Sequence, residues 1–388
     1  MYEARLRSRL VRAARAARGA RAAGAALVAR VAPLARATRA ARATRARRTA
    51  RATRATRVAI STSTLARSLG LVVVAGAILF AASQLLSSFQ NLQLAEGAYY
   101  FVVLAGLTVL TGSSGQISLG HGALMAVGAY AVALLIGDEH WALLPALLAA
   151  IAATAVAGVA VGAAASRLRG PYLAGATLAL AVGLPAVSEQ FPETLGGANG
   201  LTIEPRTPPR GLGGGFPLER WEAWIACAGA LVALFVLRNL THSAVGRSFR
   251  AVRDDEIAAS LCGLRVGWVR TSAFVVSAGC AGLAGGLLTV VLQLAAPGAF
   301  ELSLSLSLLT AIVLGGLGSL AGAIWGAGLL VLLPGWTSDL SHSFSLPTNV
   351  SNNLPLAIYG AILILAMLAW PSGIQGALAR AVIWVKGR

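Results

Sequence analysis

The chain has 388 residues, of which 57% are hydrophobic and only 12% are charged, and its mean hydropathy is +0.74. A soluble domain carries about 25% charged residues, so this composition excludes a soluble globular protein and indicates an integral membrane protein. The net charge of +18 is concentrated near the N-terminus, because residues 1–67 hold 18 of the 32 basic residues and only Glu3 of the 14 acidic ones.

Residues 1–67 are a low-complexity segment of Arg, Ala and Thr, with arginine at every third position from Arg36 to Arg57. A period of three does not match the helical period of 3.6, so no apolar face can form and we expect this tail to be disordered. We favour a solvated extension or a wrongly assigned start codon over a polybasic arm that binds anionic lipid or nucleic acid. Membrane lipid is an expected partner of the chain; nucleic acid is not.

Residues 68–371 are predicted to form an all-α polytopic membrane domain of about ten helices, some of them interrupted. A helix needs about 20 apolar residues to cross the hydrocarbon layer. A C-terminal tail, residues 372–388, follows. The predicted spans lie near 69–87, 97–112, 117–136, 142–165, 171–188, 222–238, 268–292, 302–315, 320–335 and 354–370.

Basic residues predict the orientation of these spans. With ten spans, the arginine tail, a charged loop at 239–267 and the C-terminal tail all fall on one side, which the positive-inside rule assigns to the cytoplasm. The Gly/Pro-rich loop 189–221 falls on the external side. We therefore expect a multi-pass protein of a bacterial cytoplasmic membrane, with both termini in the cytoplasm.

Glycine interrupts the apolar sequence in two corresponding places. Residues 110–130 read LTGSSGQISLGHGALMAVGAY, and the uncharged run 302–333 is too long for one span and contains LGGLGSL. Interrupted helices in corresponding halves of a transporter are typical of its transport path. The corresponding glycines are Gly112 and Gly115 in the first segment and Gly315 and Gly318 in the second.

Four polar residues in apolar surroundings are candidates for lining a translocation path. They are Gln116, Ser118 and His121 in the first interrupted segment and Thr177 in the fifth span. The alternative, which we favour, is that their side chains hydrogen-bond the backbone groups freed by the glycines, or pack helices together.

A charged island, GRSFRAVRDDEIAASLCGL at 246–264, separates two long apolar runs. Gly246 is expected to release the chain from the preceding span. Acidic residues then begin a short amphipathic helix, because a helix N-terminus carries partial positive charge, and Gly263 is placed to end it in a left-handed cap. The residues expected to dock this segment on a partner are Arg250, Arg253, Asp254, Asp255, Glu256, Ile257, Ala258, Leu261 and Gly263.

This island resembles the cytoplasmic coupling segment of LivM-type permeases, the membrane subunits of ABC importers for branched-chain amino acids. Three further stretches are similar to that family: 110–130, GGANGL at 196–201, and LGGLGSL at 314–320. The resemblance covers roughly residues 69–377. It implies a second related permease, two ABC ATPase subunits docked on the coupling segment, and an extracytoplasmic binding protein facing GGANGL.

The sequence also indicates that another polypeptide hydrolyses ATP to drive transport. A phosphate-binding P-loop needs Gly-Lys-Ser/Thr, and the only lysine is Lys386. We expect no enzymatic activity, no catalytic residue, no cofactor and no metal site in this chain. The alternatives are a self-sufficient secondary carrier or channel, which the lack of an acid deep in a span disfavours, and a membrane-tethered polybasic scaffold. The resemblance leaves the solute open among branched-chain amino acids, urea and short amides.

Overall fold

The computed structural model describes residues 65–137, 139–166, 171–209, 211, 215–343, 360–361, 364–365, 368 and 373–386. Residues 1–64 of the predicted tail lie outside this part. The chain divides into the units Met1–Thr64 and Leu65–Arg388, and the structure described below belongs to the second.

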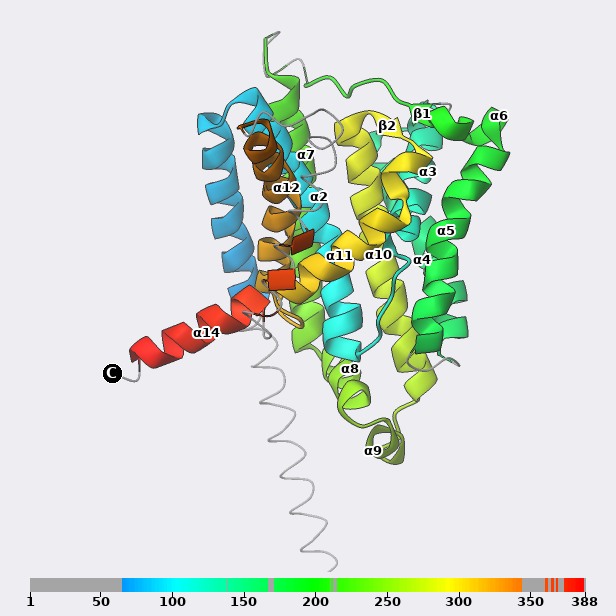
Figure 1. The fold of residues 1–388 in the computed structure, drawn as a ribbon, viewed down its shortest axis with the longest axis vertical. Coiled ribbons are helices and arrows are strands. Elements are labelled where there is room, and N and C mark those ends of the chain that lie inside the picture. The colour runs from blue at the N-terminus through cyan, green and yellow to red at the C-terminus, as the bar shows by residue number, and fades with distance from the viewer. Residues whose placement is uncertain are drawn as a thin grey trace, which may run out of the picture. The chain divides into compact units, whose positions relative to one another are not determined.

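The described part is a bundle of helices with one two-stranded sheet (Figure 1). A first helix, Leu65–Leu85, precedes α2. The others are α2 (Ser88–Leu107), η1 (Thr108–Ser113), α3 (His121–Gly137), α4 (Leu143–Ala165), α5 (Pro171–Gln190), α6 (Pro192–Leu195), η2 (Gly197–Asn199), α7 (Leu218–His242), α8 (Ala244–Asp254), α9 (Glu256–Leu261), α10 (Val266–Leu292), η4 (Pro297–Phe300), α11 (Leu302–Gly315), α12 (Leu320–Ser343) and α14 (Gly373–Lys386). Strands β1 (Leu201–Thr202) and β2 (Leu294–Ala295) are antiparallel.

Helices α2 and α10 form the centre of the bundle. Their most apolar windows are 72% and 67% buried, against 6% for the helix Leu65–Leu85. Helix α10 packs on α3 and α4, and α2 packs on α7 and α12. A helix that is apolar all round is buried within protein or faces lipid. The two central helices are buried within the protein. The helix Leu65–Leu85 exposes most of its side chains, as a helix that faces lipid does.

Helices α3 and α10 approach so closely that glycine is required at their contact. A Cβ built on Gly128 would lie 2.5 Å from the Cα of Gly282, and one built on Gly285 would lie 2.7 Å from the carbonyl carbon of Met125. Small residues of this kind let membrane helices pack backbone against backbone. This contact fixes α3, and with it the end of the irregular segment that directly precedes α3.

The all-α polytopic architecture is confirmed, and most predicted spans coincide with helices. Within the described residues, seven helices are long and apolar enough to cross a membrane, and two shorter apolar ones are His121–Gly137 and Leu320–Trp336. The tenth predicted span, 354–370, lies mostly outside those residues, so the count of ten stays a prediction. The run 302–333 is divided between α11 and α12, as its glycines predict.

The predicted start of the second span, at 97, was wrong. Helix α2 begins at Ser88, where Ser87 and Gln90 form a reciprocal capping box. The polar first turns of this helix hide it from a hydropathy count, and Asn91 within them is buried against backbone carbonyls.

Candidate functional site

Helix α8 leaves the end of α7 at a corner made by Ser243. The hydroxyl of Ser243 accepts hydrogen bonds from the amides of Val245 and Gly246, at 3.1 and 3.5 Å. The expectation that Gly246 releases the chain was therefore wrong, because the serine cap ends one helix and begins the next. Gly246 lies inside the first turn of α8, where a Cβ would lie 2.6 Å from the carbonyl oxygen of Leu240.

Helix α9, Glu256–Leu261, is capped at both ends as the sequence predicts. The Asp255 carboxylate accepts hydrogen bonds from the amides of Ile257 and Ala258, at 2.9 and 3.0 Å. Gly263 has a φ of +87°, and its amide and the next one bond to carbonyls in the last turn of α9. This is a Schellman cap, which favours glycine at the left-handed position. Two caps hold a helix too short to persist alone.

The apolar face predicted for α9 is present and faces away from the bundle. Ile257 is 74% exposed, Leu261 is 84% exposed and Ala258 is exposed, whereas Ala259 on the opposite side is buried. Figure 1 shows α8 and α9 beyond the ends of α7 and α10. An exposed pair of large aliphatic side chains on a capped helix is suited to insertion into a partner's groove.

The charged residues before α9 bond to the protein's own backbone. Arg250 donates to the carbonyl of Thr241 at 3.0 Å, and Arg253 donates to the carbonyl of Gly112 at 2.6 Å. The carboxylate of Asp254 accepts from two nitrogens of the Arg253 guanidinium, at 2.9 and 2.8 Å. The predicted docking residues therefore divide into an exposed aliphatic group on α9 and a charged group whose side chains bond to other groups of the same chain.

Glu256, the first residue of α9, forms an ion pair with Arg270 of α10. The carbonyl of Arg270 accepts a hydrogen bond from the side-chain amide of Gln116 at 3.1 Å. This pair connects α9 to the first interrupted segment, which lies elsewhere in the sequence.

That segment begins as a π-helix and then loses helical structure. After η1, Gly115 takes a φ of +74°, and regular structure resumes only at His121. π-Helical turns are rare and often lie at functional sites. The predicted third span, 117–136, is thus an extended entry followed by α3.

The candidate path residues are buried around this break, and each has at least one hydrogen-bond partner, although the side-chain oxygen of Gln116 has none. The ring nitrogens of His121 lie 3.1 Å from the hydroxyl of Ser118 and 2.7 Å from that of Ser277 on α10. Gln116 also donates to the hydroxyl of Ser114, at 2.8 Å. The hydroxyl of Thr177 accepts from the amide of Leu119 at 2.9 Å, so α5 supplies a partner to the unwound backbone.

This geometry favours the interpretation that the four side chains support the break. Backbone groups freed within a membrane protein need partners, and serine and threonine hydroxyls supply them. The amide of Gly122 bonds in the same way to the hydroxyl of Ser305, at 3.0 Å. Sequence reasoning missed Ser277, Ser305 and the link through Arg270. Their only sequence signal is a polar residue within or beside an apolar span.

The two glycine turns meet in space. A Cβ built on Gly112 would lie 2.5 Å from the Cα of Gly318. Gly115 and Gly318, the second glycine of each predicted pair, both have positive φ, +74° and +83°. The internal similarity noted in the sequence therefore corresponds to one contact between the two interrupted regions.

The stretch GGANGL, expected on the external side, lies next to the strand that follows the C-terminal end of α10. Strand β1, which begins at the last residue of this stretch, pairs with β2 in the register Leu201 to Ala295 and Thr202 to Leu294. The left-handed positions are Gly196, Gly197 and Gly200, so glycine makes the turns here and Asn199 does not.

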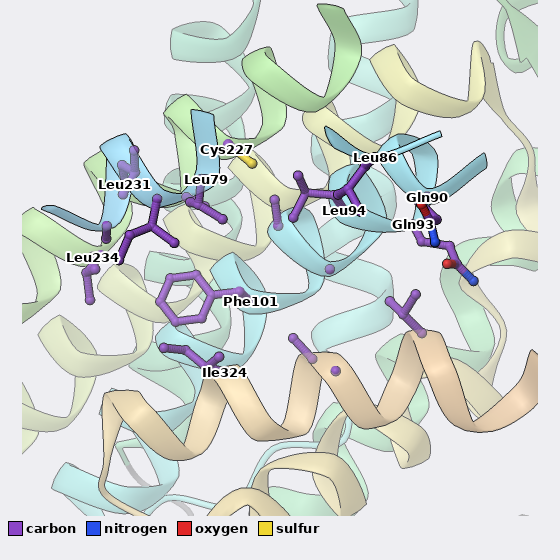
Figure 2. Close-up of a pocket in the computed structure, with 18 of the residues that line it drawn as sticks. Leu79, Leu86, Gln90, Gln93, Leu94, Phe101, Cys227, Leu231, Leu234 and Ile324 are labelled. Atoms are coloured by element: carbon purple, nitrogen blue, oxygen red, sulfur yellow. The ribbon is translucent and has the colours of Figure 1, made fainter. Parts of the chain in front are cut away.

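A separate apolar cavity of about 610 Å³ lies between the helix Leu65–Leu85, α2, α7 and α12 (Figure 2). Aliphatic and aromatic side chains such as Leu79, Phe101 and Leu234 line it, with Gln90 and Gln93 toward one end. This lining offers few partners to a polar solute, so the cavity is a poor candidate for a polar transport path.

The sequence of this bundle matches a known family. The model of the branched-chain amino acid transport system / permease component matches residues 91–367. The chain belongs to this family. It is 32% identical over 299 residues to the high-affinity branched-chain amino acid transport system permease protein LivM of Escherichia coli (strain K12) and of Salmonella typhimurium (strain LT2). The match covers 71% of this chain and 67% of theirs.

A second group of relatives carries the name LivH. The chain is 26% identical over 297 residues to the LivH permease protein of Salmonella typhimurium, covering 72% of this chain and 92% of LivH. No solved structure matches the chain at a significant level. The resemblance to LivM-type permeases is confirmed, and the permease is a multi-pass membrane protein of the ABC transport class.

Proposed function

We propose that this permease is a transmembrane subunit of an ATP-driven importer for branched-chain amino acids or a related small polar solute, energised by separate ATPase subunits. The observation that carries the proposal is α9, a doubly capped helix that presents Ile257 and Leu261 away from the bundle. A self-sufficient carrier has no need of such a surface, whereas a subunit driven by a partner does.

The assembly follows from the relatives and from the surfaces of the chain. LivM and LivH proteins are both permeases by name, so we propose pairing with a second, LivH-like permease. Two ATPase subunits dock at α9 and its counterpart, on the cytoplasmic side together with both termini. An extracytoplasmic binding protein delivers the solute at the loop 189–221, and residues 68–371 make up the membrane domain.

The interrupted segment 108–120 is the proposed moving part of the path. Gln116, Ser118, His121 and Thr177 hold it in the arrangement described above through their hydrogen bonds. Movement of the segment exchanges these internal hydrogen bonds for contacts with a polar solute.

Reconstitution tests the proposal. Proteoliposomes that contain the permease and its cognate partners are expected to accumulate radiolabelled leucine, or another small polar solute, only with ATP inside and binding protein outside. Accumulation by the permease alone, driven by a proton or sodium gradient, would support the carrier alternative instead.

The isolated permease is expected to have no ATPase activity, because its one lysine is Lys386 and no P-loop is present. Phosphate release is measured from the pure subunit in nanodiscs, with the complete transporter as the positive control. Hydrolysis that co-elutes with the permease after every other protein has been removed would contradict this.

The arginine-rich tail is expected to be dispensable for transport. A variant that begins at Ser61 keeps every described residue and should reach the membrane and support uptake at the level of the full chain. Normal membrane abundance with lost uptake would show that the tail is functional. Loss of uptake by the full chain in liposomes without anionic lipid would then identify a lipid-binding role of the tail.

A further inference from the structure

We propose that Arg253 is a positioning residue that fastens the corner between α8 and α9 to the contact between the two glycine turns, and thereby transmits movement of α9 to the interrupted helices. This inference rests on the proposed function, since it assumes that a partner moves α9.

The acceptor of the Arg253 hydrogen bond is the backbone carbonyl of Gly112 in the first interrupted segment. Gly112 lies near the end of η1, where the helical pattern fails: the amide of Gln116 bonds to the carbonyl of Leu110, six residues before it, whereas an α-helical bond would reach Gly112. Arg253 supplies a charged donor to the Gly112 carbonyl at 2.6 Å. A charge-assisted hydrogen bond is stronger than a neutral one, so this attachment is firm.

The surrounding residues leave room for the Arg253 side chain and hold its guanidinium in place. Asp254 binds two other nitrogens of the same guanidinium and fixes its plane. Gly115 lies against the arginine stem, and a Cβ there would be 2.8 Å from Arg253 Cγ. An alanine at 115 would displace the arginine and also suffer strain at a φ of +74°.

The acceptor residue Gly112 also contacts the second interrupted region. Gly112 is the residue that touches Gly318, so the arginine is bonded to the junction of the two interrupted regions. The glycine turn between α11 and α12 also contacts the start of α14, since a Cβ built on Gly373 would lie 2.6 Å from the Cα of Gly316. One hydrogen bond from α8 thus reaches a point shared by η1, the turn before α12 and the start of α14.

A second chain of bonds, through Glu256 and Arg270, links α9 to the same interrupted segment. Glu256 pairs with Arg270, whose carbonyl holds Gln116, so residues 112–116 are bonded from both sides of the link between α8 and α9. Within α9 itself only Ala259 is buried. Few apolar contacts anchor α9, so polar bonds of this kind are suited to carry its movement.

The test measures solute uptake and ATP hydrolysis in the same proteoliposomes of the complete transporter. Arg253→Gln is expected to recover the ATPase subunits in a pull-down at the wild-type level and to keep hydrolysing ATP. Its uptake per ATP hydrolysed should fall roughly tenfold, the effect of losing one charge-assisted hydrogen bond. Arg253→Lys keeps one charged donor and should recover part of the ratio.

Arg247→Gln is the matched control. Arg247 is on the same helix and donates to the carbonyl of His242 at 3.3 Å, without reaching the interrupted segment. Its uptake per ATP should equal that of the wild type. If Arg253→Gln does not reach the membrane, Arg253→Met, which also lacks the charged donor, is measured in its place.

Two results would overturn the inference. One is an unchanged ratio in the Arg253 variant that is measured. The other is loss of the ATPase subunits from that variant, which would make Arg253 a docking residue. Failure of the proposed function is distinguishable from both, because the wild-type transporter would then show no ATP-dependent uptake.

Discussion

Replacement of Ile257 and Leu261 together by aspartate is expected to abolish recovery of the ATPase subunits with the permease. Both side chains are exposed in the subunit, at 74% and 84%, and burial of each in a groove contributes about 1.5–3 kcal/mol. Loss of both therefore weakens docking by at least about 3 kcal/mol, which is a hundred-fold or more in Kd. The measurement is a pull-down from membranes that contain both permeases.

The matched control places the same two negative charges on α8, as Ala244→Asp with Ala251→Asp. Both alanines are exposed, and neither belongs to the apolar face of α9. This variant should keep its ATPase subunits. Unchanged recovery with the Ile257 and Leu261 double aspartate would mean that α9 is not the coupling element, and the proposed function would lose its main support.

Charge reversal of Asp255 and Glu256 to lysine should be less damaging than the double aspartate. It removes an N-cap, which costs about 0.5–2 kcal/mol, and the ion pair to Arg270, but it leaves the aliphatic side chains in place. The same pull-down ranks the two variants.

Gly128→Leu is expected to prevent α3 and α10 from packing. Even the first atom of a side chain would collide with the backbone of Gly282. Overpacking of a tight site costs about 1–3 kcal/mol, and a contact between two backbones has no flexible group that can move aside. We expect a clear fall in the melting temperature of the detergent-solubilised permease, with aggregated protein in size-exclusion chromatography.

Gly175→Leu on α5 is the control for this change. Gly175 is exposed, and no heavy atom lies within 4 Å of a Cβ built there. The variant should melt at the wild-type temperature or above, since glycine is unfavourable within a helix. Equal melting of both leucine variants would contradict the close packing of α3 on α10.

The sequence by itself determined the features that depend on neighbouring residues. A span is a run of about 20 apolar residues, so 142–165 and 268–292 were predicted within a few residues of α4 and α10. The caps of α9 act over two or three residues, so Asp255 and Gly263 could be recognised from their spacing alone. The shared face of Ile257 and Leu261 follows from the helical period in the same way, whereas its exposure is decided by the packing of the bundle.

Tertiary structure alone decided which distant groups meet. Arg253 and Gly112 are 141 residues apart, and His121 and Ser277 are 156 apart, and neither pair has a local signal. Sequence reasoning also failed where two signals lie close together. Ser243, not Gly246, makes the corner between α7 and α8, because its hydroxyl donates to the carbonyl of Leu240 at the end of α7 and accepts from the amides of Val245 and Gly246 at the start of α8. The sequence shows Arg253 only as one arginine of a basic loop. The folded chain places it within hydrogen-bond distance of the Gly112 carbonyl, so that it connects α8 to the interrupted helix.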